Sequence, residues 1–233
     1  YMSLFTNIVI KGGLNSNLLV VTSALPNEGK TLTACNLALT SALKGKKTLL
    51  MDCDLRKPDI FRIFNLPLSP GLKEIIEEKV SREKAIHDIT SIFIANKEKR
   101  EEIMKKKDLM NFYVLTSGSI SHEYERIFDS IQFSRLLRYI REQFELCVID
   151  APPLLTAPET LSLISKIGSV LIVCQKQKNS RELIKRVSQI IKDTGAEFFG
   201  ICLNNIKKKE IKEHSGYYRY YRYYKYYKKY YKK

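Results

Sequence analysis

Residues 18–32 read LLVVTSALPNEGKTL, and this stretch decides the fold. The apolar run Leu18–Val21 predicts a buried strand, and the turn-forming run Pro26–Gly29 separates it from a helix-like segment. A strand, a loop and a helix N-terminus in this order predict a phosphate-binding loop, because backbone N–H groups at a helix start attract anions. In such a loop Lys30 would reach the β- and γ-phosphates, and the Thr31 hydroxyl would ligate Mg²⁺.

The loop departs from the pattern G-x-x-x-x-G-K-[ST], because Ala24 stands where the first glycine is expected. Taken alone, the stretch is also compatible with an ordinary strand–turn–helix that carries an exposed lysine. The residues of the loop are the candidates for binding ATP: Ala24, Pro26, Asn27, Glu28, Gly29, Lys30, Thr31 and Leu32.

Apolar runs alternate with helix-like segments along the rest of the chain. We expect further strands at 48–51, 112–115, 146–149, 169–175 and 198–203, and helices at 1–10, 31–43, 60–64, 71–78, 81–88, 123–144, 158–166 and 180–194. In the long helix 123–144 we expect Ile127, Ile131 and Ile140 to face inward. Near-continuous apolar strands between helices predict an α/β fold with a mostly parallel sheet covered on both faces.

Acidic residues follow two of these strands. Asp52 and Asp54 come directly after one strand, and Asp150 comes directly after another. Because the carboxyl ends of parallel strands share one edge of a sheet, these acids can converge with Lys30 and Thr31. Phosphoryl transfer needs such a set: a cation, a metal held by a hydroxyl and an acid, and another acid for the nucleophile. Each Asp alone could be a turn former or a helix cap, but the joint pattern predicts a nucleotide site.

Composition is that of a globular protein, with 44% hydrophobic and 28% charged residues among 233. The net charge is +15, but seven bases and no acid lie in 215–233, and subtracting them leaves +8. Another basic cluster lies at 97–107. The charge is therefore weak evidence for nucleic-acid binding.

The five cysteines are widely spaced and form no C-x-x-C pair. We expect Cys147, Cys174 and Cys202 to be buried, reduced thiols rather than parts of a disulfide framework or a zinc site. No apolar run approaches the length of a membrane span, and the N-terminus does not resemble a signal peptide, so we expect an intracellular protein.

With these motifs in view, the sequence resembles the bacterial tyrosine kinases (BY-kinases) of capsule and exopolysaccharide synthesis, a P-loop NTPase family related to Min- and Par-type ATPases. Residues 23–31 look like the family's Walker A element, 49–58 like Walker A′ and 147–153 like Walker B. Residues 200–204 look like the family's last strand, whose terminal Asn204 lies near the adenine.

The resemblance implies an ATP-dependent protein-tyrosine kinase that uses ATP and Mg²⁺. Lys30 would stabilise the phosphates, and Asp52 would be the base for the tyrosine hydroxyl. Thr31, with Asp54 and Asp150, would hold Mg²⁺.

The resemblance also implies partners: a homo-oligomer, a membrane-protein activator of the chain-length regulator type, a cognate tyrosine phosphatase and other protein-tyrosine substrates. It places the protein in the cytoplasm at the inner face of the plasma membrane, through a partner or a missing N-terminal region. The family's ring-forming Glu-x-x-Arg-x-x-Arg pattern is replaced here, since Met2 and Phe5 stand at the arginine positions. The segment Ser119–Tyr124 likewise replaces a proline-rich one.

We expect residues 1–214 to form the kinase domain and 215–233 a flexible basic tail. The resemblance makes the tail the site of autophosphorylation in trans, on ten tyrosines: Tyr217, Tyr218, Tyr220, Tyr221, Tyr223, Tyr224, Tyr226, Tyr227, Tyr230 and Tyr231. Aromatic residues interleaved with bases could instead bind single-stranded nucleic acid, which the kinase-like site makes the weaker interpretation.

Two other functions stay open at this point. A Min- or Par-type ATPase switch on DNA or membrane would share the fold, but its signature lysine is absent from Ala24–Pro26. A non-catalytic adaptor whose tail grips a polyanion would bind tightly without turnover.

Overall fold

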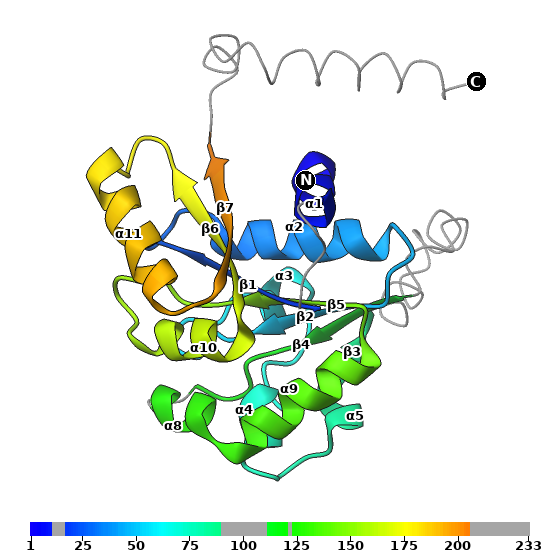
Figure 1. The fold of residues 1–233 in the computed structure, drawn as a ribbon. Helices are drawn as coiled ribbons and strands as arrows, with labels where there is room; N and C mark the ends of the chain where they lie inside the picture. The colour runs from blue at the N-terminus through cyan, green and yellow to red at the C-terminus, as the bar shows by residue number, and fades with distance from the viewer. Residues whose placement is uncertain (11–16, 90–110, 121–122, 206–233) are drawn as a thin grey trace, which may run out of the picture.

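A computed structural model describes residues 1–10, 17–89, 111–120 and 123–205 (Figure 1). The expected tail and the basic cluster at 97–107 lie outside the described residues. The strands are β1 (Leu18–Ser23), β2 (Thr48–Asp52), β3 (Ile86–Asp88), β4 (Phe112–Leu115), β5 (Leu146–Asp150), β6 (Ser169–Gln175) and β7 (Glu197–Asn204). They form one sheet in the order β3-β4-β2-β5-β1-β6-β7, and all neighbouring strands are parallel except β3 and β4.

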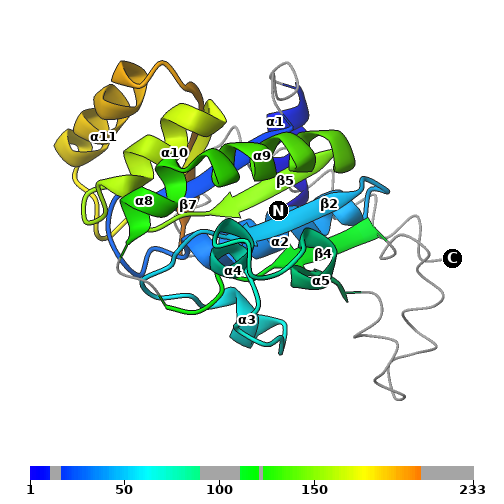
Figure 2. The ribbon, with the colours of Figure 1, turned by 90° about the horizontal axis from the view of Figure 1, so that it is seen from below.

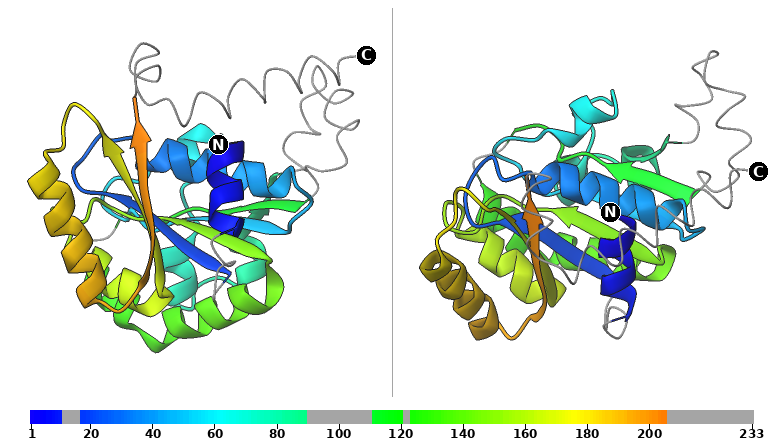
Figure 3. Two further views of the ribbon diagram at one scale, coloured as in Figure 1. Left: turned by 45° about the horizontal axis from the view of Figure 1, so that its top comes forward. Right: turned by 90° about the horizontal axis from the view of Figure 1, so that it is seen from above.

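Helices cover both faces of the sheet, as the sequence predicts. They are α1 (Met2–Ile10), α2 (Lys30–Ala42), α3 (Ile60–Ile63), α4 (Leu72–Ile76), α5 (Arg82–Ala85), α8 (Tyr124–Asp129), α9 (Ile131–Gln143), α10 (Glu159–Ile167) and α11 (Arg181–Asp193). Residues of α1, α2 and α3 pack on one face, and residues of the other helices pack on the opposite face (Figures 1 and 2). Figure 3 shows α1 beside α2, and α11 beside the edge strand β7.

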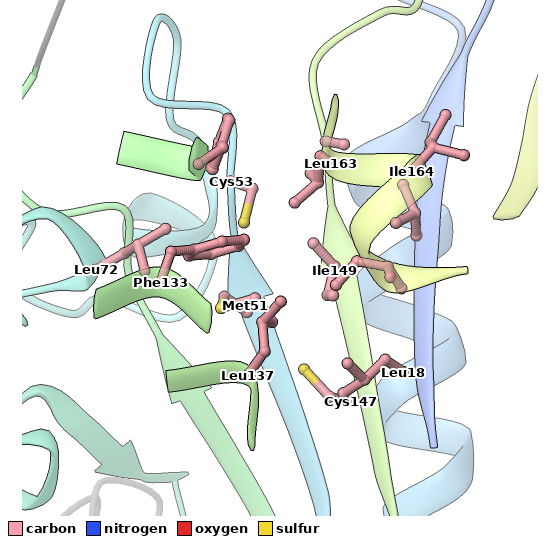
Figure 4. Packing of buried hydrophobic residues seen from close by; sticks show 14 of the residues in the cluster. Leu18, Met51, Cys53, Leu72, Phe133, Leu137, Cys147, Ile149, Leu163 and Ile164 are labelled. Carbon is pink, nitrogen blue, oxygen red and sulfur yellow. The ribbon is translucent and has the colours of Figure 1, made fainter. Parts of the chain in front are cut away.

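Fully buried apolar side chains fill both layers. Figure 4 shows Met51 of β2 and Ile149 of β5 facing Phe133 of α9 and Leu163 of α10. Burying one such side chain contributes about 1.5–3 kcal/mol relative to leaving it in water. These contacts fix the three central strands, and with them the loops at their carboxyl ends.

The prediction of a helix at 81–88 is wrong for the second half of this range. α5 ends at Ala85, and Ile86–Asp88 form the edge strand β3, which pairs antiparallel with β4. The pairing of Ile86 with Leu115 spans distant parts of the chain, so a local pattern could not reveal it.

The helix expected at 123–144 divides at Ser130. This residue has an extended backbone (φ −67°, ψ 153°), and its hydroxyl accepts a hydrogen bond from the N–H of Phe133 at 3.1 Å. The division turns α9 relative to α8, so Ile131 is 62% exposed rather than inward, whereas Ile127 and Ile140 are buried.

The five cysteines form no disulfide, and four of them are buried. Cys202 is only half-buried, because it lies on β7 at the edge of the sheet, so its expected burial is wrong. In the described part of the chain, no helix combines the length and the apolar character that crossing a membrane requires.

Candidate active site

The site lies at the carboxyl ends of β1, β5 and β2, which are neighbours in the middle of the sheet (Figure 1). Asp52 of β2 lies directly beside Asp150 of β5 in the register, and Asp150 lies beside Val21 of β1. The loop after β1 leads through Gly29, whose φ is +89°, into α2. The parallel order of these strands is what brings the acids to the lysine.

Lys30, the first residue of α2, is the centre of the site. Its Nζ lies 2.9 Å from Oδ2 of Asp54, 3.5 Å from Oδ1 of Asp150 and 3.3 Å from the hydroxyl of Thr31. Only 13% of the Lys30 side chain is exposed. Three oxygens from three segments thus surround one cation. The structure brings Lys30 into contact with Thr31, Asp54 and Asp150, as the sequence predicts, whereas the oxygens of Asp52 accept backbone hydrogen bonds instead.

Burial and charge act in opposite directions on these groups. Burial alone would lower the pKa of Lys30, but Asp150 and Asp54 outweigh it and raise the pKa, so the ammonium stays protonated. Burial raises the pKa of Asp150 to about 6, although Lys30 opposes this shift. Burial, followed by the repulsion of Asp150, raises the pKa of Asp52 well above its usual value.

Asp52 is fully buried, and both its oxygens accept backbone hydrogen bonds. Oδ1 accepts from the N–H of Asp54 at 3.0 Å, and Oδ2 accepts from the N–H of Ile60 at 3.3 Å. These bonds shape the loop between β2 and α3. The geometry thus shows a structural contribution of Asp52, and its assignment as the base stays a prediction.

A cavity of about 360 Å³ opens beside Lys30. Its wall comes from the β1–α2 loop, the start of α2, the β2–α3 loop and the β5–α10 loop. The lining residues are Pro26, Asn27, Glu28, Gly29, Lys30, Thr31, Leu32, Asp54, Arg56, Lys57, Asp59, Pro152, Pro153, Thr156 and Ala157. All but one of the candidate ATP-binding residues of the loop therefore border one space.

The exception, Ala24, is fully buried in the core and does not line the cavity. Asn204, the other expected ATP-binding residue, ends β7 and does not line the cavity either. Its Nδ2 donates to the carbonyl of Glu28 at 2.9 Å. A Cβ added to Gly29 would lie 2.1 Å from this nitrogen, so a larger residue would displace the Asn204 amide as well as strain the backbone at a φ of +89°.

Glu28 has a role in the loop that the sequence pattern did not reveal. Its side chain is 1% exposed, and its Oε2 accepts from the N–H of Leu25 at 2.8 Å. Its Oε1 accepts from the N–H of Gln175 at 3.1 Å and from the side-chain amide of Asn179. The carboxylate thus joins the loop to the end of β6, and contributes to the site by holding the loop.

Arg56 and Glu159 are a second pair that the sequence analysis missed. Arg56 lines the cavity, and its Nε and Nη2 lie 2.7 and 2.9 Å from the two carboxylate oxygens of Glu159. Glu159 begins α10 and is 2% exposed. An acidic residue at the start of a helix is explained by its interaction with the helix dipole. The sequence around Glu159 therefore gives no sign that it pairs with Arg56.

The oxygens of Thr31, Asp54 and Asp150 suit Mg²⁺. They already surround a cation, Lys30 Nζ, within 3.5 Å. Among the described residues, no group of three or more His, Cys, Asp and Glu side chains could hold a metal by itself. Proteins commonly bind Mg²⁺ through one or two carboxylates together with phosphate oxygens.

Comparison with known proteins gives consistent matches over this region. A family model described as an AAA domain matches residues 27–199. The tyrosine-protein kinase CpsD of Streptococcus pneumoniae serotype 4 is 30% identical, over 88% of this chain and 83% of that protein. The putative tyrosine-protein kinase CapB of Staphylococcus aureus is 28% identical, over 91% of this chain and 85% of that protein.

Solved structures of kinase domains and of a P-loop ATPase superpose on the chain. The chimerical protein CapA2B2 superposes with a TM-score of 0.75 at 28% identity, over 87% of this chain and 82% of that chain. The VpsO kinase domain superposes with a TM-score of 0.73 at 27% identity, over 88% and 93% of the two chains. The septum site-determining protein MinD of Pyrococcus horikoshii, complexed with Mg-ADP, has a TM-score of 0.60 at 17% identity over 80% and 69%, and shows the fold alone.

Proposed function

From its membership of the AAA-domain family of P-loop ATPases, in which it groups with the bacterial tyrosine-protein kinases, we propose that this chain is an ATP-dependent protein-tyrosine kinase. It phosphorylates its own C-terminal tyrosines in trans and thereby regulates capsule or exopolysaccharide synthesis. The observation that carries the proposal is the position of Lys30, held between Asp54 and Asp150 at the wall of the cavity.

The transfer step places charge where this site can stabilise it. The phenolic oxygen of a tyrosine forms a bond to the γ-phosphorus, and the bond from that phosphorus to the bridging oxygen breaks, leaving its electron pair on ADP. Lys30 and the backbone N–H groups at the start of α2 stabilise the charge on the phosphates. Thr31, Asp54 and Asp150 would hold Mg²⁺, which neutralises phosphate charge when it is bound.

The proton of the phenol goes to Asp52 in this proposal. The position of Asp52 at the end of β2, beside Asp150, supports this role, and its raised pKa means that the carboxyl must be deprotonated before it can act as the base. Its two backbone hydrogen bonds support the other role, that of ordering the loop. Asp52→Asn cannot take the proton and keeps an acceptor for the N–H of Asp54, but its Nδ2 faces the N–H of Ile60. Nucleotide binding by this variant is therefore measured beside phosphorylation, to show that the loop is intact.

The acceptor and the partners follow from the resemblance. The ten tail tyrosines are the proposed phosphoacceptors, and each phosphate adds about −1.5 to −2 charge to the basic tail. We propose that a membrane-protein activator brings the kinase to the inner face of the plasma membrane. A cognate phosphatase would reverse the modification, and oligomer formation would present one subunit's tail to another.

The test is incubation of the full chain with Mg-ATP, with and without a candidate activator, followed by detection of phosphotyrosine. Lys30→Met should abolish the signal, and Asp52→Asn should reduce it about 100-fold or more. Lys44→Met, an exposed change at the end of α2, is the matched control and should leave the signal unchanged. Equal signals from the wild type, Lys30→Met and Asp52→Asn would contradict the proposed mechanism.

A further inference from the structure

The pair of Arg56 and Glu159 joins the two loops that carry the acids of the site. Arg56 lies in the β2–α3 loop, two residues after Asp54, and Glu159 lies at the end of the loop that follows Asp150. The backbone N–H of Lys57 also donates to Oδ1 of Asp54 at 3.1 Å, so the β2–α3 loop curls around that carboxylate. The direction of the Arg56 side chain is therefore tied to the geometry around Asp54.

The two partners have very different access to solvent. The Arg56 side chain is 42% exposed and lines the cavity, whereas the Glu159 side chain is 2% exposed. Two parallel N–H···O bonds fix the plane of the guanidinium, which a single-point contact would not do. The ion pair thus presents its positive end to the cavity and keeps its negative end in the protein.

Three basic residues line the cavity, Lys30, Arg56 and Lys57, and of these Arg56 is the one held by a bidentate ion pair. Lys30 contacts two carboxylates, those of Asp54 and Asp150, so these three groups carry a net negative charge when both acids are ionised. A triphosphate entering the cavity adds further negative charge. A fixed guanidinium at the wall offsets part of this charge, and its planar shape matches phosphate oxygens.

We infer that Arg56 binds the phosphoryl group that is transferred, and that Glu159 is a positioning residue that holds Arg56 in place. This inference rests on the proposed function, since it assigns a further phosphate-binding residue to the same site. If the ion pair were purely structural, breaking it would leave the cavity's preference for ATP over ADP unchanged.

The test measures dissociation constants of the full chain for Mg-ADP and for Mg-AMP-PNP, a non-hydrolysable ATP analogue. Arg56→Met should weaken AMP-PNP binding about tenfold, as expected for a lost charge-assisted hydrogen bond, and leave ADP binding within about twofold. Arg56→Lys keeps the charge without the planar fork and should give an intermediate loss for AMP-PNP.

Glu159→Gln should weaken AMP-PNP binding about threefold while ADP binding stays the same. The double variant Arg56→Met/Glu159→Gln should be no weaker than Arg56→Met alone, because Glu159 acts only through Arg56. Arg138→Met, which removes an exposed arginine of α9 that does not line the cavity, is the control and should change neither constant.

Equal losses for both nucleotides, or no loss for either, would overturn the inference. So would independent effects of the two single variants that add in the double variant. Because nucleotide binding does not require an acceptor, the proposed kinase activity is tested separately by phosphorylation of the wild-type tail. A wild type that discriminates through Arg56 but leaves its tyrosines unmodified would refute the kinase proposal and retain this inference.

Discussion

Glu28 shows how one buried carboxylate can order the loop that borders the cavity. It accepts hydrogen bonds from Leu25, Gln175 and Asn179, so it joins residues that are close in the sequence to residues far along it. A buried acceptor of this kind is costly to remove, because its donors lose their partners. The loop geometry therefore depends on contacts with the end of β6.

We predict that Glu28→Ala lowers the free energy of unfolding by about 3 kcal/mol, because three donors lose a charged acceptor. Nucleotide affinity should fall as well, since the loop loses its support. Denaturant unfolding and nucleotide titration measure the two effects. Glu142→Ala, at an exposed position on α9, is the control, and a Glu28→Ala variant as stable as this control would contradict the role of Glu28.

Gly29 gives a second prediction at the residue scale. Alanine at this position meets a φ of +89° and forces the side chain of Asn204 away from the carbonyl of Glu28. We expect a cost of about 2 kcal/mol, one part for the backbone and one for the lost hydrogen bond. Gly45→Ala has a similar φ of +84° and open space around it, so it should cost only about 1 kcal/mol.

Asn204→Ala separates the two contributions to the Gly29→Ala cost. In that background, Gly29→Ala should cost no more than Gly45→Ala does, because the crowding side chain is gone. Chemical denaturation of the four variants gives the comparison. A full cost of about 2 kcal/mol in the absence of the Asn204 side chain would show that crowding is not the cause.

At the scale of single elements, the division between α8 and α9 is set by one hydroxyl. Ser130 begins α9 as its N-cap and accepts from the N–H of Phe133, which anchors Phe133 in the core. The amphipathic pattern continues across Ser130, which is why the sequence predicts a single helix there. A single cap residue inside a periodic apolar pattern is a weak signal for a helix boundary. The packing of Phe133 in the core determines that the helix divides at Ser130.

We predict that Ser130→Ala destabilises the protein by about 1 kcal/mol, since the N-cap hydrogen bond is lost. Ser134→Ala, one turn later in the same helix, should be neutral or slightly stabilising because alanine favours a helix interior. The midpoints of thermal unfolding compare the two variants directly. The cap would be irrelevant to stability if both variants unfolded at the same temperature.

At the scale of the whole molecule, the sequence predicts the sheet and its central site well. The strand–loop–helix stretch 18–32 and the acids Asp52, Asp54 and Asp150 are local signals, and the parallel order of the strands brings them together as a site. What the sequence could not predict depends on distant pairs. The partner of Arg56 lies 103 positions away, and β3 is defined only by its pairing with β4.

The buried charge of the site predicts opposite effects of pH on stability and on binding. The pKa of Asp150 is about 6 in the folded chain, above its value in an unfolded chain, so its ionised form costs stability at neutral pH. As the pH falls through about 6, Asp150 takes up a proton and this cost is relieved. Its oxygens are then worse ligands, so Mg²⁺-dependent nucleotide binding should weaken by up to about tenfold per pH unit.

Titrations with Mg-ADP between about pH 8 and pH 5 measure this dependence. Asp150→Asn should bind weakly throughout this range, without the break near pH 6. The same titrations in EDTA should lack the break, because no metal is bound. An affinity of the wild type that stays constant down to about pH 5 would contradict the assigned role of Asp150.

The central claim is that the site at Lys30 transfers phosphate from ATP to the tyrosine tail. The most direct measurement is the intact mass of the full chain after incubation with Mg-ATP, followed by mapping of the modified residues. The proposal predicts several added phosphates, all within Tyr217–Tyr231, on the wild type and none on Lys30→Met. To test the reaction in trans, two variants are mixed. One is a Lys30→Met chain with an intact tail, and the other is a chain with Lys30 intact whose ten tail tyrosines are replaced by phenylalanine. Phosphate on the Lys30→Met tail is the predicted result, and an unmodified tail in both experiments, with nucleotide bound, would contradict the claim.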